Sequence, residues 1–284
     1  MSPHHPTIRT TRSGEAPFTE RTPRVVAAGR LRKRAGRERA GRFLAEGAQA
    51  VREALEWAAA GSGAVHELFV TSAAAERDPL LRQRAAELGI AVSEVTERAA
   101  AGLSETVTPQ GIVAVCDRFD RPLDAVLSPS ARLVVVLVGV ADPGNAGSVI
   151  RVADAAGADV VLLAGDTVDP HNGKCVRAST GSIFHLPMAT TRDPAAALYA
   201  CRGAGLRILG ADRHAEADLD EQRDRLAKPT AWVFGSEAHG LPAEALRLVD
   251  DVLRVPIYGA AESLNLATAA ALCLYASASA QRCG

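Results

Sequence analysis

Short apolar runs alternate with amphipathic segments along most of the chain, which is the pattern of an α/β fold. In its first part, Leu44, Ala48, Val51 and Leu55 recur at helical spacing, and short apolar runs with β-branched residues predict strands. The expected elements are helices over 43–60 and 77–88 and strands over 65–70, 90–95 and 111–116. Together they predict a compact α/β domain over residues 21–117.

A second α/β domain is predicted over residues 132–284. Runs such as LVVVLV are apolar without alternation, as expected for parallel strands that are covered on both faces. The expected strands span 132–139, 158–164, 206–211, 230–235 and 251–256. The last helix, predicted over 263–281, is almost wholly small and apolar, so we expect it to be buried or packed against a partner. Residues 118–131, with two prolines, are a predicted linker.

Composition narrows the class of protein. With 284 residues, 48% of them hydrophobic and 23% charged, the chain is globular rather than fibrous or wholly disordered. Residues 1–20 are polar and are predicted to be disordered, with no apolar core for a signal peptide. The sequence has no run of 18 or more apolar residues, so no membrane-spanning helix is predicted. The five cysteines are scattered, without metal-ligand spacing, so we expect a cytoplasmic protein with reduced thiols and no metal site.

The charge is unevenly distributed. The net charge is only −1, yet residues 21–42 contain nine basic residues and one acidic residue. A local basic arm of this kind suits contacts with nucleic-acid phosphates, although a solvated helix face is the alternative. The residues expected to bind RNA are Arg30, Arg32, Lys33, Arg34, Arg37, Arg39 and Arg177.

Three motifs carry polar side chains near the ends of predicted strands. The first, GVADPGNAGSVIRVADAAG at 139–157, leads from a strand into a helix. Asn145 is suited to cap this helix, whose N–H groups suit an anion. We place Arg151 near the helix N-terminus, where a cation opposes the helix dipole, so a phosphate partner explains it better than helix stability does. An ordinary turn with a solvated arginine is the alternative.

The second motif, WVFGSEAHGLP at 232–242, ends a predicted strand at Gly235. Glu237 and His239 follow in a glycine-containing loop, at the strand end where an open α/β sheet places its ligand. Glu237 is suited to accept hydrogen bonds from a substrate, and His239 to act as an acid or base. A loop carboxylate and a solvated loop histidine are the alternatives.

The third motif, VPIYGAAESLNLATAAALCLY at 255–275, leads from the last predicted strand into the last helix. Ser263 is a suitable N-cap for that helix, and capping explains it fully. Asn265 lies two residues further on, where capping explains it less well, so it is available to orient a polar ligand.

In this order and at these separations, the three motifs resemble the signature motifs of the SpoU/TrmH family of RNA 2′-O-methyltransferases, in the SPOUT superfamily. KCVRASTGSIFHLPM at 174–188 also resembles that family. RKRAGRERAGRFLAEGAQAVREAL at 32–55, together with TPQGIVAV at 108–115, resembles the family's substrate-binding domain. The resemblance covers roughly residues 21–280.

The resemblance implies a doubly wound α/β domain whose C-terminal stretch is threaded into a trefoil knot, and a homodimer formed through this domain. It also implies S-adenosylmethionine as the cofactor and no metal. The residues around the reacting ribose would be Asn145, Arg151, Glu237, Ser263 and Asn265. Cofactor contacts would fall on Leu209, Gly210, Gly235, Val255, Ile257, Leu264 and Leu266.

The resemblance leaves the RNA target open. We expect 23S ribosomal RNA, because a separate N-terminal domain with a basic arm suits a folded RNA. A transfer RNA, or a ribosomal site whose methylation gives antibiotic resistance, would use the same chemistry. A non-catalytic RNA-binding assembly factor is a different class of alternative. A nucleotide-dependent dehydrogenase is disfavoured because the G-x-G-x-x-G fingerprint is missing.

Overall fold

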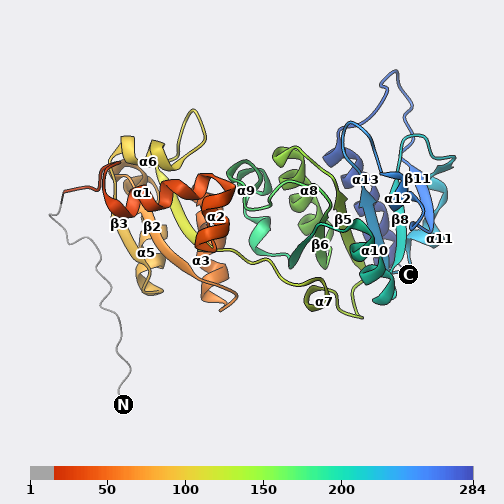
Figure 1. The fold of residues 1–284 in the computed structure, drawn as a ribbon, viewed down its shortest axis with the longest axis horizontal. Helices are drawn as coiled ribbons and strands as arrows, with labels where there is room; N and C mark the ends of the chain where they lie inside the picture. Colours follow the sequence, from red (N-terminus) through yellow and green to blue (C-terminus); the bar gives the residue numbers. More distant parts are fainter. Residues whose placement is uncertain (1–15, 284) are drawn as a thin grey trace, which may run out of the picture. The chain divides into compact units, whose positions relative to one another are not determined.

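The computed structural model describes residues 16–283, which divide into two compact units (Figure 1). The first unit ends at Arg118 but also takes in His171–Phe184; the second consists of Phe119–Pro170 and the chain from His185 onward. The sequence did not reveal that a segment from the middle of the second unit belongs to the first.

The predicted disorder over residues 1–20 is wrong for its last part, and residues 1–15 lie outside the described residues. The Phe18 amide donates to the carbonyl of Glu94 at 2.8 Å, and the Thr96 amide donates to the carbonyl of Phe18 at 2.9 Å. Phe18 also packs against the core of the first unit. Backbone pairing and an apolar contact therefore fix a segment that composition alone marks as polar.

A mixed four-stranded sheet in the order β1-β4-β2-β3 organises the first unit, with β2 and β3 parallel and the other pairs antiparallel. Its elements in chain order are α1 (Pro23–Gly29), η1 (Arg30–Arg32), α2 (Arg34–Ala40), β1 (Arg42–Glu46), α3 (Ala48–Ala59), β2 (Val65–Val70), α4 (Ser72–Arg77), α5 (Pro79–Glu87), β3 (Ala91–Glu94), α6 (Glu97–Leu103), β4 (Ile112–Asp117), α9 (Gly173–Ser179) and η2 (Ser182–Phe184).

The helix predicted over 43–60 is wrong at its start. Residues Arg42–Glu46 form β1, which pairs with β4, and the helix begins only at Ala48. Gly47 separates the two with a φ of 96°, a backbone conformation that glycine adopts at little cost. Leu44 thus belongs to a strand, although its spacing from Ala48 also fits a helix.

Aromatic packing holds His171–Phe184 in the first unit. The Phe184 ring lies 5.9 Å from that of Phe43 and 5.6 Å from that of Trp57, and the His171 ring lies 4.7 Å from that of Phe43. Phe43 is fully buried at this contact. Burial of these rings supplies an apolar anchor for the segment.

A seven-stranded sheet with parallel pairing throughout, in the order β7-β6-β5-β10-β8-β11-β9, organises the second unit. Its elements in chain order are α7 (Leu123–Val126), β5 (Leu133–Val138), α8 (Pro143–Ala156), β6 (Val160–Ala164), β7 (Met188–Thr191), α10 (Pro194–Gly203), β8 (Arg207–Ala211), β9 (Ala217–Asp218), η3 (Leu219–Glu221), α11 (Arg223–Leu226), β10 (Thr230–Phe234), α12 (Ala243–Leu246), β11 (Asp251–Arg254) and α13 (Leu266–Cys283).

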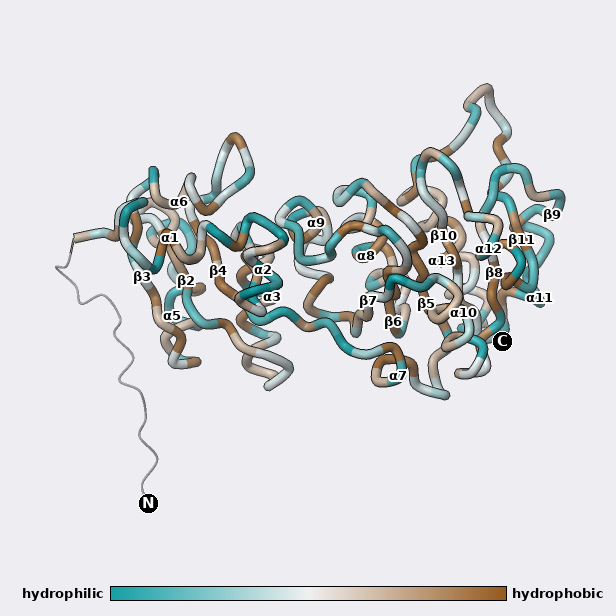
Figure 2. Tube along the Cα trace, viewed as in Figure 1, coloured by the Kyte–Doolittle hydropathy of each residue, from teal (hydrophilic) through white to brown (hydrophobic). Residues whose placement is uncertain are grey.

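Helices cover both faces of this sheet, which is why its strands read as unbroken apolar runs. On β10, Ala231 and Val233 join the core cluster that includes Leu198 of α10. The intervening Trp232 points the other way, and its indole N–H donates to the hydroxyl of Ser277 on α13 at 2.8 Å. Figure 2 shows the hydrophobic colouring of β5 and, in the first unit, the hydrophilic colouring of α2.

The strand order departs at one point from a sheet built by successive crossovers. In such a sheet β8 would lie beside β5, but here β10 lies between them and pairs with both. The carboxyl ends of β5 and β10 are therefore neighbours. The loops that follow them carry the first and second sequence motifs to the same edge of the sheet.

Candidate functional site

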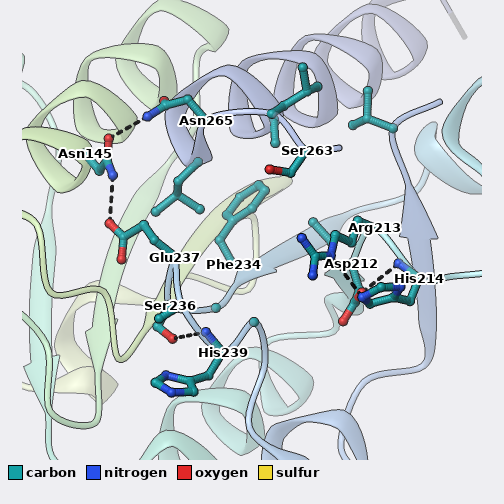
Figure 3. A pocket seen from close by; sticks show the side chains of 18 of the residues that line it. Asn145, Asp212, Arg213, His214, Phe234, Ser236, Glu237, His239, Ser263 and Asn265 are labelled. Atoms are coloured by element: carbon teal, nitrogen blue, oxygen red, sulfur yellow. Dashed lines mark hydrogen bonds between the residues drawn. The ribbon is translucent and has the colours of Figure 1, made fainter. Parts of the chain in front are cut away.

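A pocket of about 560 Å³ opens at the carboxyl edge of this sheet (Figure 3). That volume lies within the range of small-molecule sites, and the edge is where open α/β sheets bind ligands. Its lining residues come from the loops after β8, β10 and β11 and from the starts of α8 and α13. They are Asn145, Ala211, Asp212, Arg213, His214, Phe234, Gly235, Ser236, Glu237, Ala238, His239, Gly240, Leu253, Val255, Ile257, Ser263, Leu264, Asn265, Leu266 and Ala269.

Asn145 reaches this pocket because another residue caps its helix. The carboxylate of Asp142 accepts a hydrogen bond from the backbone amide of Asn145 at 2.8 Å, so Asp142 is the N-cap of α8. The sequence assigned that role to Asn145, which is wrong. With the helix end already capped, the Asn145 side chain can project toward the second motif.

Asn265, by contrast, is the capping residue of α13. Its Oδ1 accepts hydrogen bonds from the backbone amides of Ala267 at 2.9 Å and Thr268 at 3.4 Å. The sequence assigned the cap to Ser263, because it placed the helix start at 263 rather than at Leu266. Capping uses only the oxygen of Asn265 and leaves its amide nitrogen as a donor.

Three side chains, one from each motif, form a directed chain of hydrogen bonds (Figure 3). Asn265 Nδ2 donates to Asn145 Oδ1 at 2.9 Å, and Asn145 Nδ2 donates to Glu237 Oε1 at 2.8 Å. Because the helix amides require the oxygen of Asn265 to face them, the orientation of each amide along the chain is set. The carboxylate of Glu237 is thereby held at the rim of the pocket.

The loop after β10 is closed tightly on itself. The amides of Ser236 and Gly240 each donate to the other's carbonyl, at 3.0 and 2.9 Å. A Cβ at Gly235 would lie 2.1 Å from the carbonyl carbon of Gly240, so no other residue fits there without moving the backbone. The amide of His239 donates to the hydroxyl of Ser236 at 3.2 Å. The loop therefore presents a fixed backbone surface to the pocket.

Nine of the predicted site residues line this one pocket: Asn145, Gly235, Glu237, Val255, Ile257, Ser263, Leu264, Asn265 and Leu266. Leu209, Gly210 and Arg151 do not. Leu209 is fully buried, and a Cβ at Gly210 would lie 2.9 Å from the Leu241 side chain, so β8 contributes only from its last residue, Ala211, onward.

Arg151 lies on α8 but not where the sequence placed it. It is exposed and stands nine residues into a helix of 14 residues, so the dipole argument does not apply to it. It remains a predicted catalytic residue that lies outside the pocket of its own chain.

Sequence reasoning missed Asp212, Arg213 and His214, which line the pocket after β8. Their signal was available, since three polar residues directly follow the apolar strand LRILGA at its carboxyl end. It missed Phe234 and Leu253 because both are buried and read as ordinary strand residues.

The residues expected to bind RNA lie in the first unit and differ in availability. Arg30, Arg32, Lys33, Arg34 and Arg39 are exposed. Arg37 is only 2% exposed, and its Nη1 donates to the carbonyls of Leu31 at 3.0 Å and Arg32 at 2.8 Å. Its assignment as a phosphate ligand is wrong, because its guanidinium is buried on backbone carbonyls. Arg177 is half-buried and donates to Glu46 at 3.0 Å.

Residues 16–283 contain neither a metal-binding cluster nor a membrane-spanning helix. No group of three or more His, Cys, Asp or Glu side chains in this part of the chain is arranged to hold a metal ion. Within the same range, no helix has both the length and the apolar character needed to cross a membrane.

Comparison with known proteins gives matches over both units. The sequence model of the SpoU rRNA Methylase family matches residues 132–275, and that of the MRM3-like substrate binding domain matches residues 22–114. The chain is 35% identical over 246 residues to the 23S rRNA (guanosine(2553)-2′-O)-methyltransferase RlmP of Bacillus subtilis, covering 87% of this chain and 92% of that protein.

Solved structures of methyltransferases are also similar to this chain. The AdoMet-bound rRNA methyltransferase from Sinorhizobium meliloti has a TM-score of 0.77 and 30% identity, covering 90% of this chain and 94% of that one. The SpoU methyltransferase AviRb from Streptomyces viridochromogenes, in complex with AdoMet, has a TM-score of 0.80 and 29% identity, covering 93% and 100%. Both similarities extend well beyond the methylase domain alone. The chain therefore belongs to the SpoU rRNA methylase family.

Proposed function

We propose that this protein transfers the methyl group of S-adenosylmethionine to a ribose 2′-hydroxyl of 23S ribosomal RNA, and that it does so in the cytoplasm. The observation that carries the proposal is the Asn265–Asn145–Glu237 hydrogen-bond chain at the rim of a pocket of about 560 Å³. Three motifs far apart in the sequence meet there. Relatives that share both domains are named as enzymes of this reaction.

The pocket fits S-adenosylmethionine. Its wall combines apolar side chains, such as Leu253 and Leu264, with a backbone-rich loop that Gly235 allows to close tightly. Apolar walls suit a purine ring, and exposed backbone groups suit its polar edges. We assign cofactor contacts to the predicted cofactor residues that line the pocket, namely Gly235, Val255, Ile257, Leu264 and Leu266. Ala211 and the pocket residues that follow it take the place of Leu209 and Gly210.

The cofactor supplies an electrophilic methyl group on a sulfonium. Methyl transfer would form a carbon–oxygen bond as the carbon–sulfur bond breaks, with S-adenosylhomocysteine as the leaving group and the hydroxyl proton passing to solvent. Glu237 and Asn145, held by Asn265, and Ser263 at the same rim, orient the ribose so that its 2′-oxygen faces the pocket. A guanidinium keeps its proton in proteins, so we assign Arg151 to a neighbouring phosphate and to the developing negative charge on the 2′-oxygen.

The exposed basic residues of the first unit would hold the RNA by its phosphates. Arg30, Arg32, Lys33 and Arg39 are exposed and lie within ten residues of one another in the sequence. The buried Arg37 stabilises the backbone of this segment by donating to the carbonyls of Leu31 and Arg32. Phosphate contacts position a nucleic acid without reading its sequence. Choice of the target nucleotide would then rest with the rim of the pocket.

We also propose that the protein works as a homodimer formed through α13. One face of this helix is in the core, where Cys273, Leu274 and Ser277 are buried, yet Leu272 is 45% and Tyr275 is 53% exposed. The Tyr275 hydroxyl reaches the carbonyl of Ala155 on α8, so the exposed apolar face adjoins the helix that carries Arg151. A dimer through this face brings Arg151 to the interface. Light scattering should show a dimer that Leu272→Glu dissociates.

Transfer of a tritiated methyl group to total bacterial RNA, followed by mapping of the labelled nucleotide, tests the reaction and the target together. The expected result is one labelled ribose in 23S ribosomal RNA. The relatives are named for different nucleotides, guanosine 2553 and uridine 2479, so the position must be mapped rather than transferred from them. Label on a base, label confined to transfer RNA, or no label would contradict the proposal.

A further inference from the structure

Arg213 is the one permanently cationic side chain among the described residues that line the pocket. The same lining holds two carboxylates, those of Asp212 and Glu237. Figure 3 shows the Arg213 side chain extending into the pocket on the side of Phe234. The arginine and the two carboxylates together give the lining a charge of one negative unit.

A short chain of hydrogen bonds holds Arg213 in place. Its Nε donates to Nε2 of His214 at 2.9 Å, and the backbone amide of His214 donates to Oδ1 of Asp212 at 2.8 Å. With Nε used in this way, the two terminal nitrogens of the guanidinium point onward as a planar fork. Such a fork matches a carboxylate in a bidentate pair.

Other arginines of the second unit are used differently. Arg202 pairs with Asp250, Arg207 pairs with Asp251, and Arg254 pairs with Asp218. In Arg213, by contrast, the guanidinium Nε donates to a ring nitrogen of His214 rather than to an aspartate. An arginine held by an imidazole keeps its full charge available to an anionic ligand.

We propose that Arg213 and Asp212 together hold the amino-acid end of the cofactor, with the guanidinium binding its α-carboxylate and the Asp212 carboxylate facing its ammonium group. This inference rests on the proposed use of S-adenosylmethionine. A zwitterion needs a cation and an anion side by side, and two adjacent residues on the wall of the pocket supply them. The net negative charge of the lining also suits the sulfonium.

The adjacent carboxylate decides between this ligand and an RNA phosphate. A phosphodiester carries only negative charge, so Asp212 would repel it and weaken any contact with Arg213. The amino-acid group carries both charges and gains from both residues. Arg213 lies two residues after Ala211, the last residue of β8, so it is part of the pocket wall rather than of the basic arm.

Calorimetry with three ligands tests the assignment without any turnover. S-adenosylmethionine carries the carboxylate, decarboxylated S-adenosylmethionine lacks only that group, and 5′-methylthioadenosine lacks the whole amino-acid end. We expect the unsubstituted protein to prefer S-adenosylmethionine over its decarboxylated form by about 10- to 100-fold, the range for a charge-assisted hydrogen bond. Arg213→Ala should reduce this preference to less than about threefold and leave the affinity for 5′-methylthioadenosine unchanged.

Two further variants sharpen the result. Arg213→Lys keeps the charge without the fork and should retain part of the preference. Arg247→Ala removes an exposed arginine of the same unit that does not line the pocket, and should change nothing. Full preference in Arg213→Ala would overturn the inference, and so would an equal loss of 5′-methylthioadenosine, which indicates a damaged pocket wall. A loss of RNA affinity alone would assign Arg213 to a phosphate instead.

The same titrations separate failure of this inference from failure of the proposed function. If the unsubstituted protein binds neither S-adenosylmethionine nor S-adenosylhomocysteine, the proposed cofactor is wrong and the inference falls with it. If it binds both, and the preference for the carboxylate survives in Arg213→Ala, only the role of Arg213 is wrong.

Discussion

The two units of this protein use polar side chains in opposite ways. In the first unit, three hydrogen-bonded charged side chains are buried: Arg37 is 2% exposed, and Glu46 and Glu67 are each 9% exposed. In the second unit the organised polar groups stand at an open rim, where Glu237 and Asn265 are exposed. Both sets are hydrogen-bonded, so bonding alone does not tell a structural group from a functional one.

The energetic cost of each arrangement explains the difference. Burial raises the pKa of Glu67, while hydrogen bonds from Ser93 and Arg24 and the charge of Arg24 lower it. Such a group stabilises the fold only as part of its network, and removing one partner leaves the other unsatisfied. Groups at the rim could bond to water instead, so the hydrogen bonds that link Asn265, Asn145 and Glu237 to one another bring little stability. Because stability does not require these rim side chains to be hydrogen-bonded to one another, their arrangement favours a role in binding or catalysis.

Arg151→Ala is the change expected to have the largest effect, and only on the chemistry. If Arg151 binds the neighbouring phosphate and stabilises the emerging negative charge, methyl transfer should fall at least about a hundredfold, which is about 2.7 kcal/mol of transition-state stabilisation. Cofactor binding should persist, because Arg151 does not line the pocket. Single-turnover methyl transfer and calorimetry measure the two quantities separately.

The control for this prediction is Arg247→Ala, which removes the same charge from another exposed position of the second unit. Near-normal turnover in Arg151→Ala would show that the residue is a solvated surface arginine. An equal loss of cofactor affinity would assign it to the pocket of a partner chain rather than to the RNA.

Arg37→Met tests the opposite side of the comparison. It leaves the carbonyls of Leu31 and Arg32 without their donor, so the free energy of unfolding should fall by about 2 kcal/mol. Hydrogen exchange should report faster opening in α1 and α2. Arg34→Met is the matched control, since the Arg34 side chain is 60% exposed and pairs with Glu38 one turn away, an interaction of about 0.5 kcal/mol. Equal effects in the two variants would contradict a structural role for Arg37.

Asn265→Asp separates capping from catalysis at one residue. An aspartate still accepts from the amides of Ala267 and Thr268, so the stability of α13 should be unchanged. It cannot donate to Asn145, so the chain to Glu237 breaks and turnover should fall about tenfold, or about 1.4 kcal/mol. Asn265→Ala should lose both functions and also cost about 1 kcal/mol of stability. Full activity in Asn265→Asp would reduce the hydrogen-bond chain to a helix cap.

The sequence predicted five of the seven strands of the second unit, because strands buried on both faces leave long apolar runs. It missed β7 and the two-residue β9, which form the two edges of the sheet. It predicted the start of α3 poorly, since Leu44 fits helical spacing, whereas the pairing of β1 with β4 and the φ of Gly47 show that a strand ends there. It could not place β10 between β5 and β8, because strand order depends on pairing between distant segments. The trefoil threading that the family resemblance implies stays a prediction.

The residues of the candidate site that belong to one of the three sequence motifs could be predicted from the sequence. Asn145, Glu237 and Asn265 were chosen from the sequence, but their mutual hydrogen bonds were not, because they depend on which residue caps each helix. Asp142 rather than Asn145 caps α8, and that exchange frees Asn145. Arg37 was misplaced for a related reason: composition counts positive charges, whereas only the fold shows which of them face water.

Lys33→Ala should have the smallest effect, and it tests the exposed basic surface that is found in the first unit. Deletion of residues 1–42 cannot test this basic surface, because Val25 and Leu31 belong to the core of the first unit. A single exposed residue can be changed without that damage. Loss of one phosphate contact should reduce the slope of log RNA affinity against log salt concentration by about one unit and weaken binding several-fold, with thermal stability unchanged.

Arg247→Ala is the control for Lys33→Ala and should leave this slope unchanged. An unchanged slope in Lys33→Ala, and again with Arg30, Arg32, Arg34 and Arg39 also replaced, would mean that the exposed arm is a solvated helix face and that the RNA is held elsewhere.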